Sequence, residues 1–183
     1  MTPFHLIPQA LAPAECDGLV ALCQSAPMQD ARLVRQTTAP QIRRAELSWL
    51  DDLPETAWVM DRMMRLTAAA NREAFGFDLT EFAESAQVAR YGAEREGHFG
   101  WHSDIGAGAL AAKRKLTIVV QLSDPADYDG GTLELRPDSS VRQTPRDRGT
   151  AIIFPSFVLH RVTPVTTGTR WSLTLWSHGP AFR

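Results

Sequence analysis

The chain has 183 residues, of which 44% are hydrophobic and 22% are charged, with a formal net charge of −2. This composition is typical of a soluble globular protein, and the length suits a single domain over 1–183. A net charge so close to zero gives no long-range attraction to nucleic acid or to an anionic membrane, so we expect neither as a partner. No apolar run approaches the roughly 20 residues that span a bilayer.

Two features near the N-terminus indicate the compartment. Residues 1–8 lack a basic start and a long apolar stretch, so we expect no secretory signal. Cys16 and Cys23 lie two turns apart on one face of an expected helix, roughly 10 Å apart by helical rise, which is too far for a disulfide. We therefore expect reduced core cysteines in a cytoplasmic protein, and no thiolate zinc site because no Cys-x-x-Cys pair occurs.

The first part of the chain, 1–84, is expected to be a helix-rich support. A short apolar run over 4–7 suggests an edge strand, and residues 45–50 suggest another strand. A proline opens a helix over 13–25, with acidic residues in its first turns. A second helix over 55–75 has a methionine and tryptophan stripe at helical spacing, which we interpret as core packing.

From residue 85 the apolar period changes to short runs separated by Gly, Pro and Asp turns. This pattern predicts a mainly β core over 85–178, either a β-sandwich or a barrel, with the N-terminal helices packed on one outer face. A turn is expected over 124–131. The expected strands are 85–91, 98–104, 115–122, 132–136, 150–154, 159–163 and 169–177, with a short one near Val141.

His102 and Asp104 end one of these strands and are two residues apart, so both side chains leave the backbone on the same face. Taken alone, His102 could equally be a surface or hydrogen-bonded histidine. Fe(II) sites for oxygen chemistry use two histidines and one carboxylate on one face of the metal. A rolled sheet can bring His160, at the start of a later strand, to this point, and it is the expected third ligand.

Arg170 lies in the last expected strand, where a buried cation is costly unless an anion meets it. An alternating strand has two faces, one a packing surface and the other suited to a polar pocket. In that pocket Arg170 can grip a carboxylate through two hydrogen bonds and Ser172 can donate another, so a dicarboxylate is the expected ligand. The packing face holds Trp171, Leu173 and Leu175, and the pocket face holds Arg170, Ser172, Thr174 and Trp176.

The region from Tyr91 to Trp176 resembles the 2-oxoglutarate- and Fe(II)-dependent oxygenases, in particular the prolyl 4-hydroxylase-like branch and its bacterial PKHD-type hydroxylases. The matching residues are Tyr91-Gly92, His102-Ser103-Asp104, Gln121-Leu122-Ser123-Asp124, Tyr128-Asp129-Gly130-Gly131-Thr132-Leu133, Phe154-Pro155-Ser156, His160-Arg161-Val162-Thr163-Pro164-Val165 and Gly168-Thr169-Arg170.

The resemblance implies a double-stranded β-helix (jelly roll) as the fold of the β core. It also implies a dioxygenase that uses Fe(II), 2-oxoglutarate and O₂, with ascorbate as a candidate reductant, and releases succinate and CO₂. It implies that His102, Asp104 and His160 are catalytic and hold the iron. The implied substrate is a prolyl residue of a protein or peptide, or a small molecule. The cosubstrate would be bound by Arg170, Ser172, Tyr91, Gln121 and Trp176.

Two departures from the family pattern are expected to matter. Gln121 stands where relatives often have a tyrosine, so the distal carboxylate of 2-oxoglutarate is expected to have a different second partner. PKHD-type chains commonly continue into a further helical segment, whereas this sequence ends at Arg183, soon after the last expected strand. A substrate-facing or dimerising element of the relatives is therefore expected to be absent.

Several other residues could contact the substrate or cover the site. His98 shares a strand face with His102 by alternation and is a candidate substrate contact, as is Trp101, although Trp101 should point away and pack. The glycine-containing loop 105–112 could act as a lid. The basic run 113–115 is expected to be a solvated loop end, and His5 and His178, near the ends of the sequence, are expected to be solvated or locally bonded.

Three other functions are alternatives to the hydroxylase. A non-catalytic jelly-roll module could use the same residues to sense a metal or a dicarboxylate. Repair of alkylated nucleic acid would need a basic groove that this mildly acidic chain does not suggest. A zinc hydrolase would need a general base beside the metal, and no residue marks one.

Overall fold

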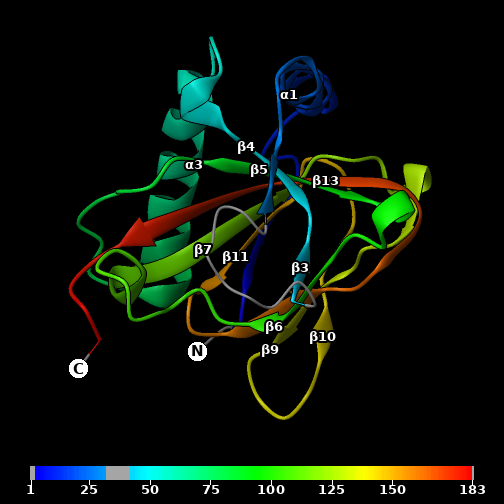
Figure 1. The fold of residues 1–183 in the computed structure, drawn as a ribbon. Coiled ribbons are helices and arrows are strands. Elements are labelled where there is room, and N and C mark those ends of the chain that lie inside the picture. The colour runs from blue at the N-terminus through cyan, green and yellow to red at the C-terminus, as the bar shows by residue number, and fades with distance from the viewer. Residues whose placement is uncertain (1–2, 32–41, 183) are drawn as a thin grey trace.

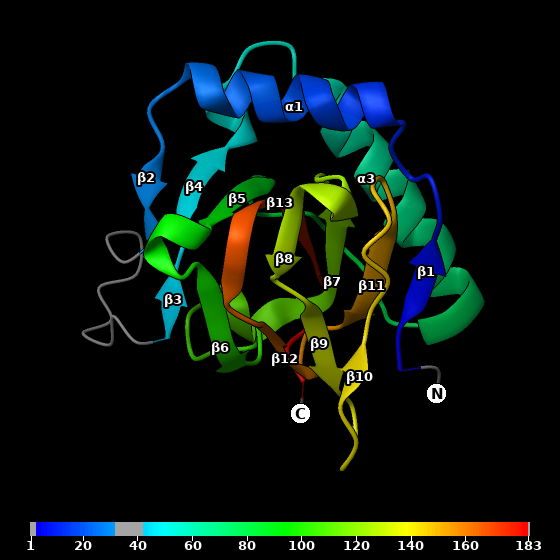
Figure 2. The same ribbon diagram turned by 90° about the vertical axis from the view of Figure 1, so that its right-hand side faces the viewer.

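A computed structural model describes residues 3–31 and 42–182 of the chain. Two antiparallel sheets face each other, and two helices lie outside the larger sheet (Figures 1 and 2). The larger sheet runs in the order β1 (His5–Ile7), β11 (Ala151–Pro155), β7 (Arg114–Gln121), β13 (Val165–His178), β5 (Gln87–Gly92), β4 (Glu46–Trp49) and β2 (Gln29–Asp30), with β8 (Tyr128–Gly130) beside β13. The smaller sheet runs in the order β10 (Arg142–Gln143), β9 (Leu133–Arg136), β12 (Leu159–Val162), β6 (His98–His102) and β3 (Arg43–Arg44).

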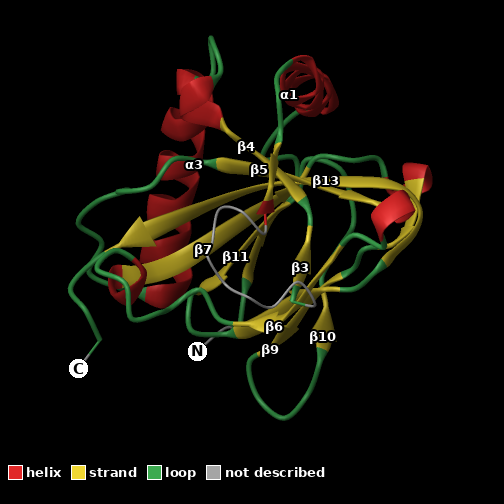
Figure 3. Ribbon diagram, in the orientation of Figure 1, coloured by secondary structure: helices red, strands yellow, loops and turns green. Residues whose placement is uncertain are grey.

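The helices cover one outer face of the larger sheet, as Figure 3 shows in red against the yellow strands. Helix α1 (Pro13–Ser25) has a proline in its first turn, and α3 (Ala57–Ala70) continues into a π-helical turn over Asn71–Phe75. That turn ends at Gly76, whose φ of 69° is a left-handed conformation that glycine adopts without strain. None of the described helices is long and apolar enough to cross a membrane.

Two apolar clusters hold the layers together. The first joins the inner faces of both helices, including Leu19 and Met63, to residues of the larger sheet such as Ile118 and Leu175. The second lies between the two sheets. Its members include Ala89, Tyr91, Val119, Leu133, Leu135, Ile152 and Phe154. The predicted jelly roll with helices on one outer face is therefore confirmed.

The predicted turn over 124–131 is partly wrong. Residues 125–127 form a short 3-10 turn, but β8 follows it and pairs with the beginning of β13. Strand β13 begins at Val165, earlier than the predicted 169, and this extra length is what β8 pairs with. The segment Tyr128–Gly130 contains Asp and Gly, which are rare in strands, so its sequence does not indicate a strand. Only its pairing with β13 makes it one.

Candidate metal centre and cosubstrate pocket

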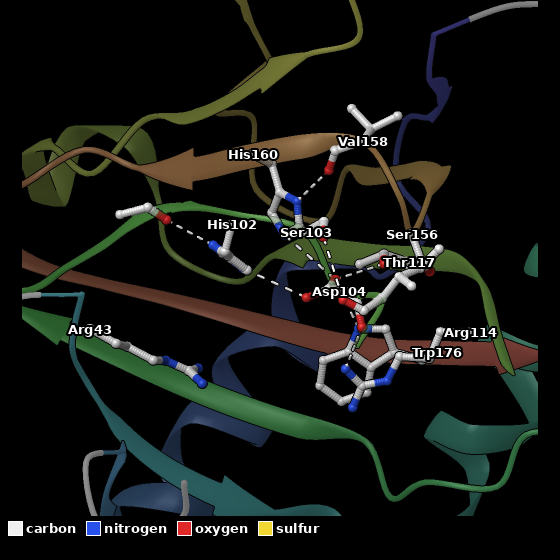
Figure 4. A network of polar contacts seen from close by, with 12 residues as sticks. Arg43, His102, Ser103, Asp104, Arg114, Thr117, Ser156, Val158, His160 and Trp176 are labelled. Atoms are coloured by element: carbon white, nitrogen blue, oxygen red, sulfur yellow. Dashed lines mark hydrogen bonds and ion pairs between the residues drawn. The ribbon is translucent and has the colours of Figure 1, made fainter. Parts of the chain in front are cut away.

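His102, Asp104 and His160 come together between the sheets (Figure 4). His102 and His160 face each other as a cross-strand pair between β6 and β12, with ring centroids 4.1 Å apart. Asp104 follows β6, where its backbone N–H donates to the carbonyl of Ser156 at 2.9 Å. His102 Nε2 lies 3.6 Å from Asp104 Oδ1, and His160 Nε2 lies 3.5 Å from Asp104 Oδ2.

Backbone carbonyls select the tautomer of both histidines. His102 Nδ1 lies 2.8 Å from the carbonyl oxygen of Gly100, and His160 Nδ1 lies 2.9 Å from that of Val158. A carbonyl only accepts, so each Nδ1 must carry the proton and each Nε2 keeps its lone pair. Both lone pairs face the Asp104 carboxylate, as two imidazole ligands of one metal require.

The carboxylate of Asp104 is oriented by two donors on one of its oxygens. Oδ2 accepts from Thr117 Oγ1 at 2.8 Å and from Trp176 Nε1 at 2.9 Å. Ser156 Oγ lies 3.0 Å from the Thr117 hydroxyl. Because Thr117 donates its hydrogen to Asp104, Ser156 donates a hydrogen bond to Thr117. Within the described residues Oδ1 accepts no hydrogen bond, which leaves it available to a metal.

Burial controls the charge of the cluster. Burial is the main cause that lowers the pKa of His102 to about 3, and His160 and Arg43 act in the same direction. Burial acts to raise the pKa of Asp104, but the two imidazoles and the bonds from Trp176 and Thr117 outweigh it and lower that pKa to about 2. At neutral pH His102 is therefore a neutral imidazole and Asp104 a carboxylate. Two imidazoles and one carboxylate are the donor set that suits Fe(II).

Arg170 lies on the opposite sheet and faces the same cavity, whose volume is about 210 Å³. One water needs only ~10–15 Å³ of such volume, so the cavity holds a small organic molecule. The Arg170 side chain has no solvent exposure, and burial lowers its pKa. Its partners, Ser172 Oγ at 3.2 Å and Gln121 Oε1 at 3.0 Å, are neutral, and its Nε has no acceptor.

A buried guanidinium without a carboxylate partner indicates a missing anion. No ion pair of Arg170 occurs in the described part of the chain, and its planar fork matches a carboxylate. The residues present therefore fit both groups that the resemblance implies: Fe(II) at the cluster and a dicarboxylate that reaches Arg170.

Three of the other predicted cosubstrate residues, Ser172, Gln121 and Tyr91, lie beside Arg170, whereas Trp176 contacts Asp104. The predicted division of β13 into two faces is confirmed: Arg170, Ser172, Thr174 and Trp176 line the cavity, whereas Trp171, Leu173 and Leu175 belong to the core under the helices. Tyr91 also lines the cavity, with its ring 5.4 Å from the Arg170 guanidinium carbon. Gln121 donates to the carbonyl of Pro145 and accepts from Arg170, so it holds the arginine in place.

A β-bulge in β6 changes which residue of that strand shares the cavity face with His102. His160 pairs with His102, but Val162 pairs with Phe99 and not with Gly100, so β6 contains one extra residue. The bulge turns Phe99 toward the cavity, where its ring stacks 3.5 Å from that of His102. Regular alternation predicted that His98 would share the face of His102, and the bulge makes that prediction wrong.

His98 and Trp101 are not among the cavity-lining residues. His98 Nδ1 lies 2.7 Å from the carbonyl oxygen of Glu96. The ring of Trp101 packs between Arg136 and Arg161, whose guanidinium carbons lie 5.2 and 4.8 Å from it. The loop 105–112 borders a shallow hollow beside Asp104 and Arg114, and a lid role for it stays a prediction.

The predicted solvated state of the basic run 113–115 is wrong for Arg114 and Lys115, which are both 6% exposed. Arg114 donates to the backbone carbonyl of Asp104 at 3.0 Å and lies 4.1 Å over the Trp176 ring. Its Nε donates to Glu84 at 2.6 Å. The run is amphipathic and charged, which suggests solvent exposure. Its burial depends on the contact of Arg114 with Glu84, which the local sequence does not show.

His178 is also placed differently from the prediction. It is fully buried, and its Nε2 lies 2.9 Å from Glu84 Oε2. The signal in the sequence for this burial is the place of His178 at the end of an apolar strand, although it also lies close to the end of the sequence. Glu84, Arg114 and His178 together form a buried polar group behind Trp176.

The chain belongs to the 2OG-Fe(II) oxygenase superfamily, whose model matches residues 86–178. The matched residues include the whole cluster and Arg170. Several curated relatives are PKHD-type hydroxylases. One from Hyphomonas neptunium is 37% identical over 89 residues, which cover 46% of this chain and 39% of the relative. One from Delftia acidovorans is 27% identical over 177 residues, 94% of this chain and 76% of the relative.

The chain spans about two fifths of the length of the curated relatives that match it first. Solved structures share the fold over nearly all of it. A Pseudomonas putida prolyl-4-hydroxylase superposes with a TM-score of 0.74 at 23% identity, covering 98% of this chain and 94% of that one. A Trichoplax adhaerens prolyl hydroxylase, in complex with a hypoxia inducible factor peptide fragment, gives 0.79 at 20% identity, covering 97% and 84%.

Proposed function

We propose that this protein is a dioxygenase that uses Fe(II), 2-oxoglutarate and O₂ to hydroxylate a substrate, with release of succinate and CO₂. The observation that carries the proposal is the position of Arg170, a fully buried guanidinium without an acid partner among the described residues. It lines the same cavity as two histidines and one aspartate with free ligand atoms. Membership of the superfamily supports the same reaction class.

Iron bound at the cluster would supply the oxidising chemistry, in which O₂ is reduced as 2-oxoglutarate loses CO₂. In this proposal His102, Asp104 and His160 are the ligands through His102 Nε2, Asp104 Oδ1 and His160 Nε2. The carbonyls of Gly100 and Val158 keep the imidazoles in the ligating tautomer. Phe99 and Phe154, which pack against the two imidazoles, exclude water from them.

Arg170 would bind the distal carboxylate of 2-oxoglutarate, with the Ser172 hydroxyl beside it. Gln121 would act through Arg170 by fixing the orientation of its guanidinium, and Tyr91 would form the wall under that guanidinium. Trp176 would act on Asp104, through its indole N–H, and not on the cosubstrate. A protein that has to bind a dianion in a largely buried cavity needs this preorganised positive charge.

The substrate in this proposal is a prolyl residue of a peptide or a small molecule. The peptide complex of the Trichoplax enzyme and the PKHD-type relatives support a peptide. The cavity itself also suits a smaller compound. A cytoplasmic location is part of the proposal and is supported by two free, buried cysteines.

Anaerobic titration of the purified protein with Fe(II) and 2-oxoglutarate tests the proposal. We expect a metal-to-ligand charge-transfer band that His160→Ala abolishes and that His5→Ala, a change on the edge strand β1, leaves in place. After O₂ is added, we expect succinate to form. A folded wild-type protein without the band would refute the site, and a band without any succinate would favour the non-catalytic sensor.

A further inference from the structure

Arg43 is a second arginine of the cavity. It lies on β3, the edge strand of the smaller sheet, where it pairs with Phe99 of β6. Its side chain lines the same cavity as the metal cluster and Arg170. Figure 4 shows it extending from the edge strand toward the cluster, on the side where His102 lies.

The guanidinium of Arg43 is incompletely satisfied. Nη2 donates to the neutral amide oxygen Gln87 Oε1 at 2.9 Å, whereas Nε is buried and has no acceptor. No ion pair of Arg43 occurs in the part of the chain that the structure describes. Neighbouring arginines differ in this respect, because Arg44, Arg95 and Arg114 each pair with a glutamate or an aspartate.

Aromatic packing holds Arg43 beside the metal cluster. Its guanidinium carbon lies 4.5 Å from the centre of the Phe99 ring, and that ring stacks 3.5 Å from the ring of His102. A planar cation on an aromatic face loses few rotamers and keeps its N–H edges directed outward. Arg43 is therefore preorganised to donate hydrogen bonds into the cavity near His102.

The charges of the loaded cavity leave Arg43 in excess. A divalent iron, the Asp104 carboxylate, the 2-oxoglutarate dianion and the Arg170 cation together sum to zero. Glu84 and Arg114, which also border the cavity, neutralise each other. One positive charge, that of Arg43, then remains in a partly buried space where an unpaired charge is costly.

We propose that Arg43 binds a carboxylate of the primary substrate, so that the substrate presents a free carboxylate, as a free amino acid or the C-terminal residue of a peptide does. This inference rests on the proposed function, because the charge balance assumes bound Fe(II) and 2-oxoglutarate. It narrows the substrate class: an internal prolyl residue of a chain with blocked ends offers no anion to Arg43.

The test uses the full chain, first loaded with Zn(II) and 2-oxoglutarate for binding by calorimetry, then with Fe(II) for succinate release. The probes are the proteinogenic L-amino acids as free acids and as carboxamides, and Pro-containing peptides with a free or an amidated C-terminus. We expect at least one acid, but not its amide, to bind and to stimulate succinate release. The free acids and the free peptides separate the two sources of carboxylate.

The variant R43Q should weaken that binding at least about tenfold, since a hydrogen bond to a charged group is lost. R43K should restore part of it. The matched control is R161Q, which removes an arginine that also lies over an aromatic ring, that of Trp101, but outside the cavity. R161Q should behave as the wild type.

Equal responses to an acid and its carboxamide, or equal responses of the wild type and R43Q, would overturn the inference. A rise in the KM for 2-oxoglutarate alone in R43Q would also overturn it, because Arg43 would then serve the cosubstrate. The anaerobic charge-transfer band of R43Q separates the two proposals. A band in R43Q shows that the metal and cosubstrate sites are intact, and its absence in the wild type refutes the proposed function itself.

Discussion

Arg170 shows how a single residue can be kept for function at a cost to stability. Its guanidinium is fully buried and bonds only to neutral groups among the described residues. Removing a charge from water costs several kcal/mol, and only a well-placed anion returns that energy. In the ligand-free protein this residue is therefore a source of instability that bound 2-oxoglutarate would relieve.

Replacement of Arg170 by methionine should separate binding from stability. We expect the affinity for 2-oxoglutarate to fall at least about tenfold, because charge-assisted hydrogen bonds are lost. The free energy of unfolding without ligands should stay equal or rise by up to about 2 kcal/mol, because an unpaired buried charge is removed. Anaerobic titration and urea unfolding measure the two quantities. Unchanged affinity would show that the cosubstrate carboxylate binds elsewhere.

Trp176 orients Asp104, a proposed metal ligand, without binding the metal itself. Its Nε1 donates to Asp104 Oδ2, and Arg114 lies over its ring. Trp176→Phe keeps an aromatic ring but removes the N–H donor, so Asp104 should turn more freely. Loss of such a partner typically costs about 10–100-fold in metal affinity.

Competition with a chromophoric chelator measures that affinity with Zn(II) or Fe(II). Trp171→Phe is the matched control, because Trp171 lies on the other face of the same strand in the core under the helices. It should leave the metal affinity unchanged. Equal losses in the two variants would indicate a general effect on β13 and not a role for the indole N–H.

The bulge in β6 limits what alternation along a strand can predict about which side chains face the cavity. Alternation along β13 correctly separates a pocket face from a packing face, because that strand is regular from Arg170 to Trp176. The same rule fails in β6, where one extra residue exchanges the positions of His98 and Phe99. A bulge depends on the pairing with β12 and β3, so the residues of β6 alone do not reveal it.

The part of β13 that leads to Arg170 depends on Gly168, which pairs with Tyr128 of β8. Its φ of 69° is left-handed, and a Cβ there would overlap the backbone carbonyl oxygen of Asp127. Gly168→Ala should therefore lower the free energy of unfolding by about 2–4 kcal/mol, through both the backbone conformation and the overlap. Because Arg170 is two residues away, the affinity for 2-oxoglutarate should fall as well.

Gly18 provides the matched control on helix α1, where a Cβ would meet nothing within 4 Å. Gly18→Ala should raise the free energy of unfolding by about 0.5–1 kcal/mol, because alanine favours a helix. Urea unfolding of both variants checks the pair. Similar stabilities of the two variants would mean that β8 shifts at little cost and that the backbone conformation at Gly168 does not constrain Arg170.

At the scale of the whole molecule, the layers and the site differ in how far the sequence predicts them. The alternating strands and the helical stripes suffice for a β core with helices on one outer face, and the family resemblance adds the jelly roll. The spacing of His102, Asp104 and His160 suffices for a hypothesis about the metal. The support behind the site does not follow from such patterns. Arg114 is part of a charged run that suggests solvent, and only its long-range contact with Glu84 explains its burial.

Glu84 joins three segments that are distant in the sequence: its own segment before β5, the beginning of β7 through Arg114, and the end of β13 through His178. Burial acts to raise the pKa of Glu84, but Arg114 and His178 outweigh it and lower that pKa. A lowered pKa means that the folded state prefers the ionised carboxylate. Glu84 therefore adds stability above its unfolded pKa of about 4.3, and this stability is lost as the pH falls through the lower, folded value.

The variant Glu84→Gln tests this contribution. At pH 7 we expect it to unfold with a free energy lower than that of the wild type by on the order of 3 kcal/mol, because Arg114 stays buried without a charge partner. The difference should shrink as the pH falls below about 4.3, because the carboxyl of the unfolded wild type is protonated first and that of the folded wild type only at its lower pKa, where it becomes neutral like the amide. Asp61→Asn, a change of an exposed carboxylate on α3, should show neither effect. A wild-type advantage that stays constant down to acid pH would mean that packing, and not the charge of Glu84, holds the three segments together.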